Sequence, residues 1–217
     1  MQATGFVKGE VNRWPQLQEL ATANDQLLAD PDWWPHLTAG DDVAGSQRLC
    51  FFVKGDNGRY VDLAEELGLA VPVPTRGIAT GDADGDGRLD LAVARQWDAP
   101  VFYHNESPSP GAFLGLRLTH DTTPVAGTRP GAGSPAVGAQ VKVTTVDGRV
   151  FVARVDGGSG HGGKRSSEVH IGLGDGVTGP VDARLSWRDR TGQVREQVLQ
   201  LTPGWHSLRL GVQAQEM

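Results

Sequence analysis

The sequence predicts a mainly β protein. Its 217 residues include 30 glycines and 13 prolines. Frequent turns of this kind favour many short strands over long helices. Apolar runs recur between the turns, and Asp147-Gly148 between two of them is a strong hairpin signal. We therefore expect an incomplete β-propeller segment with one N-terminal helix, followed by a small all-β sandwich or barrel.

Composition and charge limit the class of protein. The formal net charge of −6 argues against a nucleic-acid partner, because phosphate binding needs a basic face. No apolar run approaches the length of a membrane span, and no signal peptide is visible at the start. Cys50 is the single cysteine, so an internal disulfide is excluded. A cytosolic protein fits these facts, and so does a fragment of a longer exported protein.

The N-terminal segment predicts the helix. Apolar residues within 14–28 repeat at near-helical spacing, and Asn12 and Pro15 suit the first turn. Asp30 precedes Pro31, and a residue before proline avoids the helical region. We therefore expect the helix to end there.

Short strands are expected along the rest of the chain. In the first half they cover residues 49–53, 60–63, 76–79, 89–94 and 102–105. This order is what one propeller blade needs. In the second half they cover residues 113–118, 137–146, 149–155, 181–187, 194–201 and 206–210. The Ser/Pro-rich stretch 107–110 suggests a boundary, so we predict domains at 1–109 and 110–217.

The loop 82–90, called here the acidic loop, predicts a metal site. Positions 1, 3, 5 and 9 are carboxylates and position 6 is Gly87, which permits a sharp turn. Packed like charges repel, so we expect a cation to neutralise the folded loop. The predicted calcium ligands are Asp82, Asp84, Asp86, the carbonyl of Arg88 and Asp90, an all-oxygen set that suits Ca²⁺. Position 12 is Val93 in a strand rather than the Glu of an EF-hand. The alternative is an acidic surface turn without an ion.

A glycine-rich loop at 157–167 is a second candidate site. Its predicted ligand-binding residues are His161, Lys164, Arg165 and Ser166, which would hold an anionic or polar ligand. The glycine spacing is not that of a P-loop, and a solvated surface turn is the alternative. His170 is interpreted as a structural histidine with one ring hydrogen bond, and Trp205 as part of the β core and its rim. No constellation of acid, base and nucleophile is visible, so the sequence does not show an enzyme.

Two stretches resemble known families. Residues 76–90 resemble the FG-GAP/VCBS repeat, the calcium-loop unit of integrin-type β-propellers. The runs 137–141, 157–160, 170–174 and 181–187 resemble the ASPIC/UnbV domain. Together the chain resembles the C-terminal part of a CRTAC/ASPIC-UnbV protein. The resemblance implies a calcium-binding propeller whose remaining blades come from upstream sequence or a separate chain. Such families include secreted matrix proteins of animals and members of bacterial enediyne gene clusters.

Three functions follow as expectations. The first is a calcium-binding, non-catalytic binding or adhesion module with a glycan, protein or small-molecule ligand. The second is an accessory or Ca²⁺-dependent enzyme of secondary-metabolite biosynthesis. The third is a fragment that completes a propeller encoded by another chain.

Overall fold

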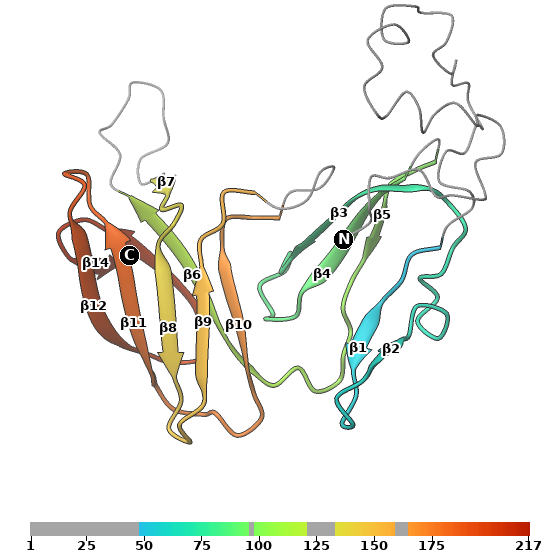
Figure 1. Cartoon of the computed structure of the whole chain (residues 1–217), viewed down its shortest axis with the longest axis horizontal. Coiled ribbons are helices and arrows are strands. Elements are labelled where there is room, and N and C mark those ends of the chain that lie inside the picture. Colours follow the sequence, from blue (N-terminus) through green and yellow to red (C-terminus); the bar gives the residue numbers. More distant parts are fainter. Residues whose placement is uncertain (1–47, 96–97, 121–132, 159–164) are drawn as a thin grey trace, which may run out of the picture. The chain divides into compact units, whose positions relative to one another are not determined.

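The computed structural model describes residues 48–95, 98–120, 133–158 and 165–217 (Figure 1). These residues form fourteen strands in four sheets, none of them closed into a barrel. The mainly β prediction is therefore confirmed. The helix predicted at 14–28 lies outside the described residues.

The described residues divide into two compact units. The first unit contains the described residues up to Ile78 together with 92–102, and the second contains 79–91 and the described residues from Tyr103 onward. The predicted division after residue 109 stays a prediction. The acidic loop therefore belongs to the same compact unit as the C-terminal strands.

A predicted hairpin opens the described chain. Strands β1 (Phe52–Lys54) and β2 (Tyr60–Asp62) pair antiparallel. Gly58 in the turn between them has a φ of 76°, which glycine adopts without steric cost. The Asp62 carboxylate accepts the backbone N–H groups of Phe51 and Ala64, which fixes the exit of the hairpin. The Gly/Asn/Asp turn signal in the sequence is thus confirmed.

The acidic loop joins two strands of a three-stranded sheet. The order in this sheet is β3 (Thr75–Gly81), β4 (Asp90–Arg95) and β5 (Val101–Tyr103) (Figure 1). Asp90 is therefore both the last residue of the loop and the first of β4. This confirms the strand-loop-strand arrangement that was predicted in place of an EF-hand.

Two sheets form the second half of the chain. Sheet I has the order β10 (Val169–Gly174), β6 (Ala112–His120), β13 (Gly204–Leu210) and β14 (Ala214–Glu216), with β7 (Ser134–Pro135) paired to β6. Sheet II has the order β12 (Val194–Leu201), β11 (Val181–Arg188), β8 (Gln140–Thr144) and β9 (Val150–Arg154). Strands β13 and β6 are parallel, whereas the pairs within sheet II are antiparallel.

One hydrophobic core lies between sheets I and II. In β11 the side chains of Val181, Ala183, Leu185 and Trp187 are buried, and the residues between them face away from the core. Sheet I contributes alternate residues of β6 and β13, and all belong to the same cluster. The period of two that the sequence showed in β11 therefore buries one face of each sheet, as in a β-sandwich.

Candidate metal centre

Asp82 organises the acidic loop through hydrogen bonds. Its Oδ1 accepts the backbone N–H groups of Gly85 at 2.8 Å and Asp86 at 3.0 Å. Its Oδ2 accepts the N–H of Gly87 at 2.8 Å and the indole N–H of Trp205 at 2.7 Å. A carboxylate has about four acceptor positions, so all those of Asp82 are in use. Partial burial would raise the pKa of Asp82, but the Trp205 indole and these N–H groups hold it below its ordinary value.

Asp90 closes the loop from the other end. It is buried, with 2% of its surface exposed. Its Oδ2 accepts the N–H of Ala83 at 2.9 Å, and its Oδ1 accepts the N–H of Asn105 at 2.9 Å. The Nδ1 of His104 lies 3.0 Å from the same Oδ1. Burial acts to raise the pKa of Asp90, but the Asn105 and Ala83 N–H groups and the His104 ring together lower it.

Oxygen ligands converge within the loop. Asp82, Asp84 and Asp90 each offer a carboxylate oxygen, and these oxygens lie within 4.8 Å of one another. A second group at the same spacing contains Asp84, Asp86 and His104. The predicted carboxylates are therefore brought together around Asp84. The role of the Arg88 carbonyl as a calcium ligand stays a prediction.

Two basic side chains lie beside the loop carboxylates, Arg88 at Asp86 and His104 at Asp84. The Arg88 guanidinium pairs with Asp86 Oδ2, and the Arg88 backbone N–H donates to Asp86 Oδ1 at 2.8 Å. His104 Nε2 lies 3.7 Å from Asp84 Oδ2, and this ring is a cation when it is protonated. One arginine and one histidine still leave at least two of the four carboxylate charges uncompensated.

Gly87 has two roles. Its φ of 89° confirms the sharp turn that the sequence predicted. It also lies against Phe113, because a Cβ at this position would sit 2.2 Å from Phe113 Cε1. Real Cβ atoms do not approach a ring carbon this closely, so the position requires glycine for packing as well as for backbone conformation.

Sheet I supplies the contacts that hold the acidic loop, and loop and sheet belong to the same compact unit. His170 Nε2 donates to the carbonyl of Gly87 at 2.9 Å, which fits the predicted structural role with one ring hydrogen bond. Trp205, expected in the β core and its rim, donates its indole N–H to Asp82. Sequence reasoning missed both partners, and it missed His104, whose one local signal is its position just after the strand β5.

The glycine-rich loop is described only in part. His161 and Lys164 lie outside the described residues. Arg165 Nη2 lies 3.6 Å from Asp156 Oδ2, and the Ser166 hydroxyl donates to Glu168 Oε2 at 2.9 Å. Both described residues thus have partners within the chain, and ligand binding here stays a prediction.

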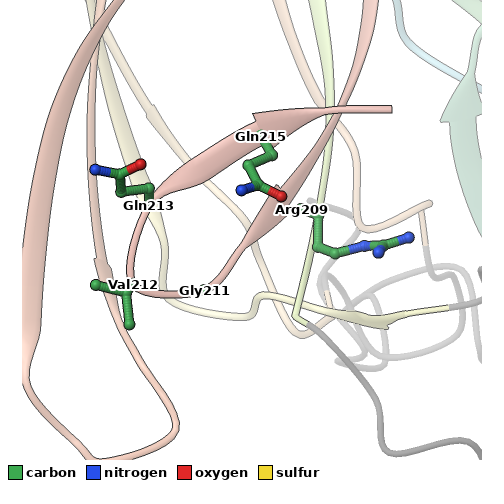
Figure 2. Close-up of a pocket in the computed structure, with 5 residues that line it drawn as sticks. All are labelled: Arg209, Gly211, Val212, Gln213 and Gln215. Atoms are coloured by element: carbon green, nitrogen blue, oxygen red, sulfur yellow. The ribbon is translucent and has the colours of Figure 1, made fainter.

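Among the hollows on the described part of the second unit, two lie at turns between strands. One, of about 210 Å³, lies at the β13–β14 turn, and Figure 2 shows the residues that line it: Arg209, Gly211, Val212, Gln213 and Gln215. Another, of about 530 Å³, lies at the β8–β9 turn beside Asp175 and Val177, where Arg149 donates to Asp147 and to the carbonyl of Leu173. Neither hollow is lined by a predicted site residue.

The C-terminal part of the chain is similar to a known family. Residues 128–216 match the family model described as ASPIC and UnbV. No curated protein matches the chain. None of the described residues forms a helix long and apolar enough to cross a membrane. The match covers β7 to β14 and excludes the acidic loop, so the part of the second unit that carries Trp205 is similar to the ASPIC and UnbV family.

Proposed function

We propose that the acidic loop binds Ca²⁺ and that the chain is a calcium-binding, non-catalytic binding or adhesion module. The observation that carries this proposal is the convergence of Asp82, Asp84 and Asp90 within 4.8 Å. Calcium prefers six to eight oxygen ligands, and carboxylates are its strongest protein ligands. The divalent charge would balance the carboxylate charge that Arg88 and His104 leave uncompensated.

The donor set fits calcium with one adjustment. Asp84 and Asp90 each offer an oxygen to the shared centre. Asp82 already accepts four N–H groups, so its coordination of a cation would exchange one of these hydrogen bonds for a metal contact. Asp86 would join when the Arg88 guanidinium moves away from its carboxylate. Bound calcium would neutralise and cross-link the loop.

The non-catalytic part of the proposal is supported by how the ionisable groups are used. In the described loop, the carboxylates accept backbone N–H groups or lie beside Arg88 and His104. None of these carboxylates lines either of the hollows described above. Such groups serve to hold the loop rather than to meet a substrate.

Calorimetric titration of the full chain with Ca²⁺ tests the proposal. We expect one calcium per chain and a large loss of affinity in Asp84→Asn, because Asp84 belongs to both groups of convergent ligands. Asp56→Asn is the matched control, since Asp56 is an exposed acid in the β1–β2 turn. Mg²⁺ should bind poorly, because it demands a smaller octahedral shell. Equal calcium affinity in the two variants would contradict calcium binding by the acidic loop.

A second candidate function is a segment of a larger β-propeller. The observation that favours it is the sheet β3-β4-β5 with the acidic loop between β3 and β4. A propeller blade has four strands, so further strands would come from other residues or from a separate chain. Phe102 in the edge strand β5 is 55% exposed, which is a surface prone to association. Light scattering should show oligomers that Phe102→Asp reduces, and a monodisperse monomer would contradict this candidate.

A further inference from the structure

The outer face of sheet I carries three rings that pack together. Phe113, His170 and Trp205 alternate with core residues along β6, β10 and β13, so they face away from the core. Phe113 and His170 stack with centroids 5.1 Å apart and planes at 7°. The Trp205 centroid lies 6.0 Å from each of them. We call these three residues the aromatic platform.

The sequence of β6 makes room for Trp205. Gly115 is the register partner of Trp205 in the parallel β6–β13 pair. A Cβ on Gly115 would lie 2.4 Å from a carbon of the indole, so the ring occupies the space that a side chain would fill. The Arg117 guanidinium lies 4.4 Å from the centroid of the same ring, and its Nε donates to Glu168 at 2.7 Å. The indole is thus held in one orientation.

That orientation points the polar end of Trp205 at the acidic loop. Asp82 accepts four N–H groups, of which three come from the loop itself and one comes from Trp205, 123 residues away. A hydrogen bond to an ionised carboxylate is stronger than one between neutral groups. The indole is therefore the one donor to Asp82 that ties the loop to another part of the fold.

Two further contacts act in the same place. His170 donates to the Gly87 carbonyl, and Phe113 packs against the bare Cα of Gly87. All of these residues belong to the second unit. All three residues of the aromatic platform therefore contact the acidic loop.

We propose that Trp205 is a positioning residue for the acidic loop, and that it couples calcium occupancy of the loop to the C-terminal sandwich. This inference rests on the proposed function. Outer partners that orient a metal-binding side chain change metal affinity by about 10–100-fold when they are removed. By fixing Asp82 Oδ2, the indole holds the carboxylate in place when the loop is empty and orders it for the cation.

The test compares two tryptophan variants of the full chain. Trp205→Phe removes the indole donor to Asp82 and keeps a ring on the platform. Trp187→Phe is the matched control, because Trp187 also donates its indole N–H, at 2.9 Å to the carbonyl of Gly211, but lies in the core. We expect Trp205→Phe to weaken calcium binding about tenfold and Trp187→Phe to leave the affinity unchanged while lowering the melting temperature.

Two further measurements have readouts other than calcium affinity. In metal-free protein, the amides of Gly85, Asp86 and Gly87 should exchange hydrogen faster in Trp205→Phe than in Trp187→Phe. In the wild type, the Trp205 indole N–H resonance should move when calcium is added, and the Trp187 resonance should not. The second measurement needs no variant, so it decides the matter if Trp205→Phe does not fold.

The outcomes separate the two proposals. Wild-type protein that binds calcium with the same affinity and the same amide exchange as Trp205→Phe overturns the positioning role and leaves the proposed function standing. An indole resonance that calcium does not move overturns the coupling in the same way. Wild-type protein that binds no calcium overturns the proposed function and the coupling with it.

Discussion

The two outer faces of the sandwich differ although the same period-two pattern builds both. Sheet I presents the aromatic platform and Gly115, and the acidic loop packs against it. Sheet II presents side chains that stay exposed, among them Val152 at 71% and Val198 at 50%. Alternation fixes which face is buried in the core. The residues at the outward positions decide whether another segment of the chain can pack on the outer face.

Glycine makes the difference between these faces. On sheet I, Gly115 admits the indole, and in the acidic loop that packs against this sheet Gly87 admits the Phe113 ring. On sheet II the outward positions include Lys142 and Arg184, whose long polar side chains are exposed to solvent. The comparison predicts that small changes on sheet I have larger effects than comparable changes on sheet II.

The largest effect is expected at Gly87. Gly87→Ala places a methyl group against Phe113, which adds an overpacking cost of about 1–3 kcal/mol to the backbone cost. Gly85→Ala is the control, because its φ of 83° is similar but a Cβ there meets no atom within 4 Å. Urea unfolding should show a clearly lower midpoint for Gly87→Ala. Equal midpoints would mean that the contact with Phe113 carries no energy.

A smaller loss is expected at Gly115. Gly115→Ala would displace the Trp205 ring and cost about 1–3 kcal/mol without a left-handed backbone term. On sheet II, Val152→Ala should stay within about 0.5 kcal/mol, because this side chain is exposed. Chemical denaturation of both variants measures the contrast. Comparable losses on the two sheets would contradict the difference between the faces.

Acid should lower the stability of the protein through the Asp189 carboxylate. The Thr191 hydroxyl and the Arg195 guanidinium lower the pKa of Asp189, beside sheet II, to about 2. Because the folded pKa lies below the unfolded value of about 3.9, this stabilisation is complete above about pH 4 and is lost as the pH falls toward 2. Asp189→Asn should flatten the dependence of the urea midpoint on pH in this window. An unchanged slope would show that Asp189 contributes nothing.

The smallest effect is expected at Arg165. Its pair with Asp156 spans 3.6 Å between half-exposed side chains, so Arg165→Ala should change the free energy of unfolding by less than about 0.5 kcal/mol. Thermal melting measures this. A larger loss would indicate that the glycine-rich loop has a structural role beyond a solvated turn.

Local patterns predicted much of the fold. The alternation in β11 and the Asp147-Gly148 turn predicted strands that the structure contains. The spacing of Asp82, Asp84 and Asp90 predicted that their carboxylate oxygens converge, as they do. These features depend on neighbours within a few residues, so periodicity and turn chemistry are enough to find them.

The anchoring of the loop could not be predicted in this way. Trp205 meets Asp82 across 123 residues, and His170 meets Gly87 across 83. The first contact depends on β13 lying parallel to β6 with Trp205 opposite Gly115, and the second on β10 lying antiparallel to β6 with His170 opposite Gly115. Strand order and register arise from packing of the whole sandwich, and no single stretch of sequence specifies them.

Thermal unfolding of the full chain in calcium and in chelator tests the calcium-loaded loop most directly. A ligand that binds only the native state stabilises it by about 2.7 kcal/mol at one hundred times Kd. We predict a higher melting temperature in calcium for the wild type and little gain for Asp86→Ala, which lacks one of the loop carboxylates. Identical melting temperatures in calcium and in chelator, for correctly folded wild-type protein, would contradict calcium binding by the acidic loop.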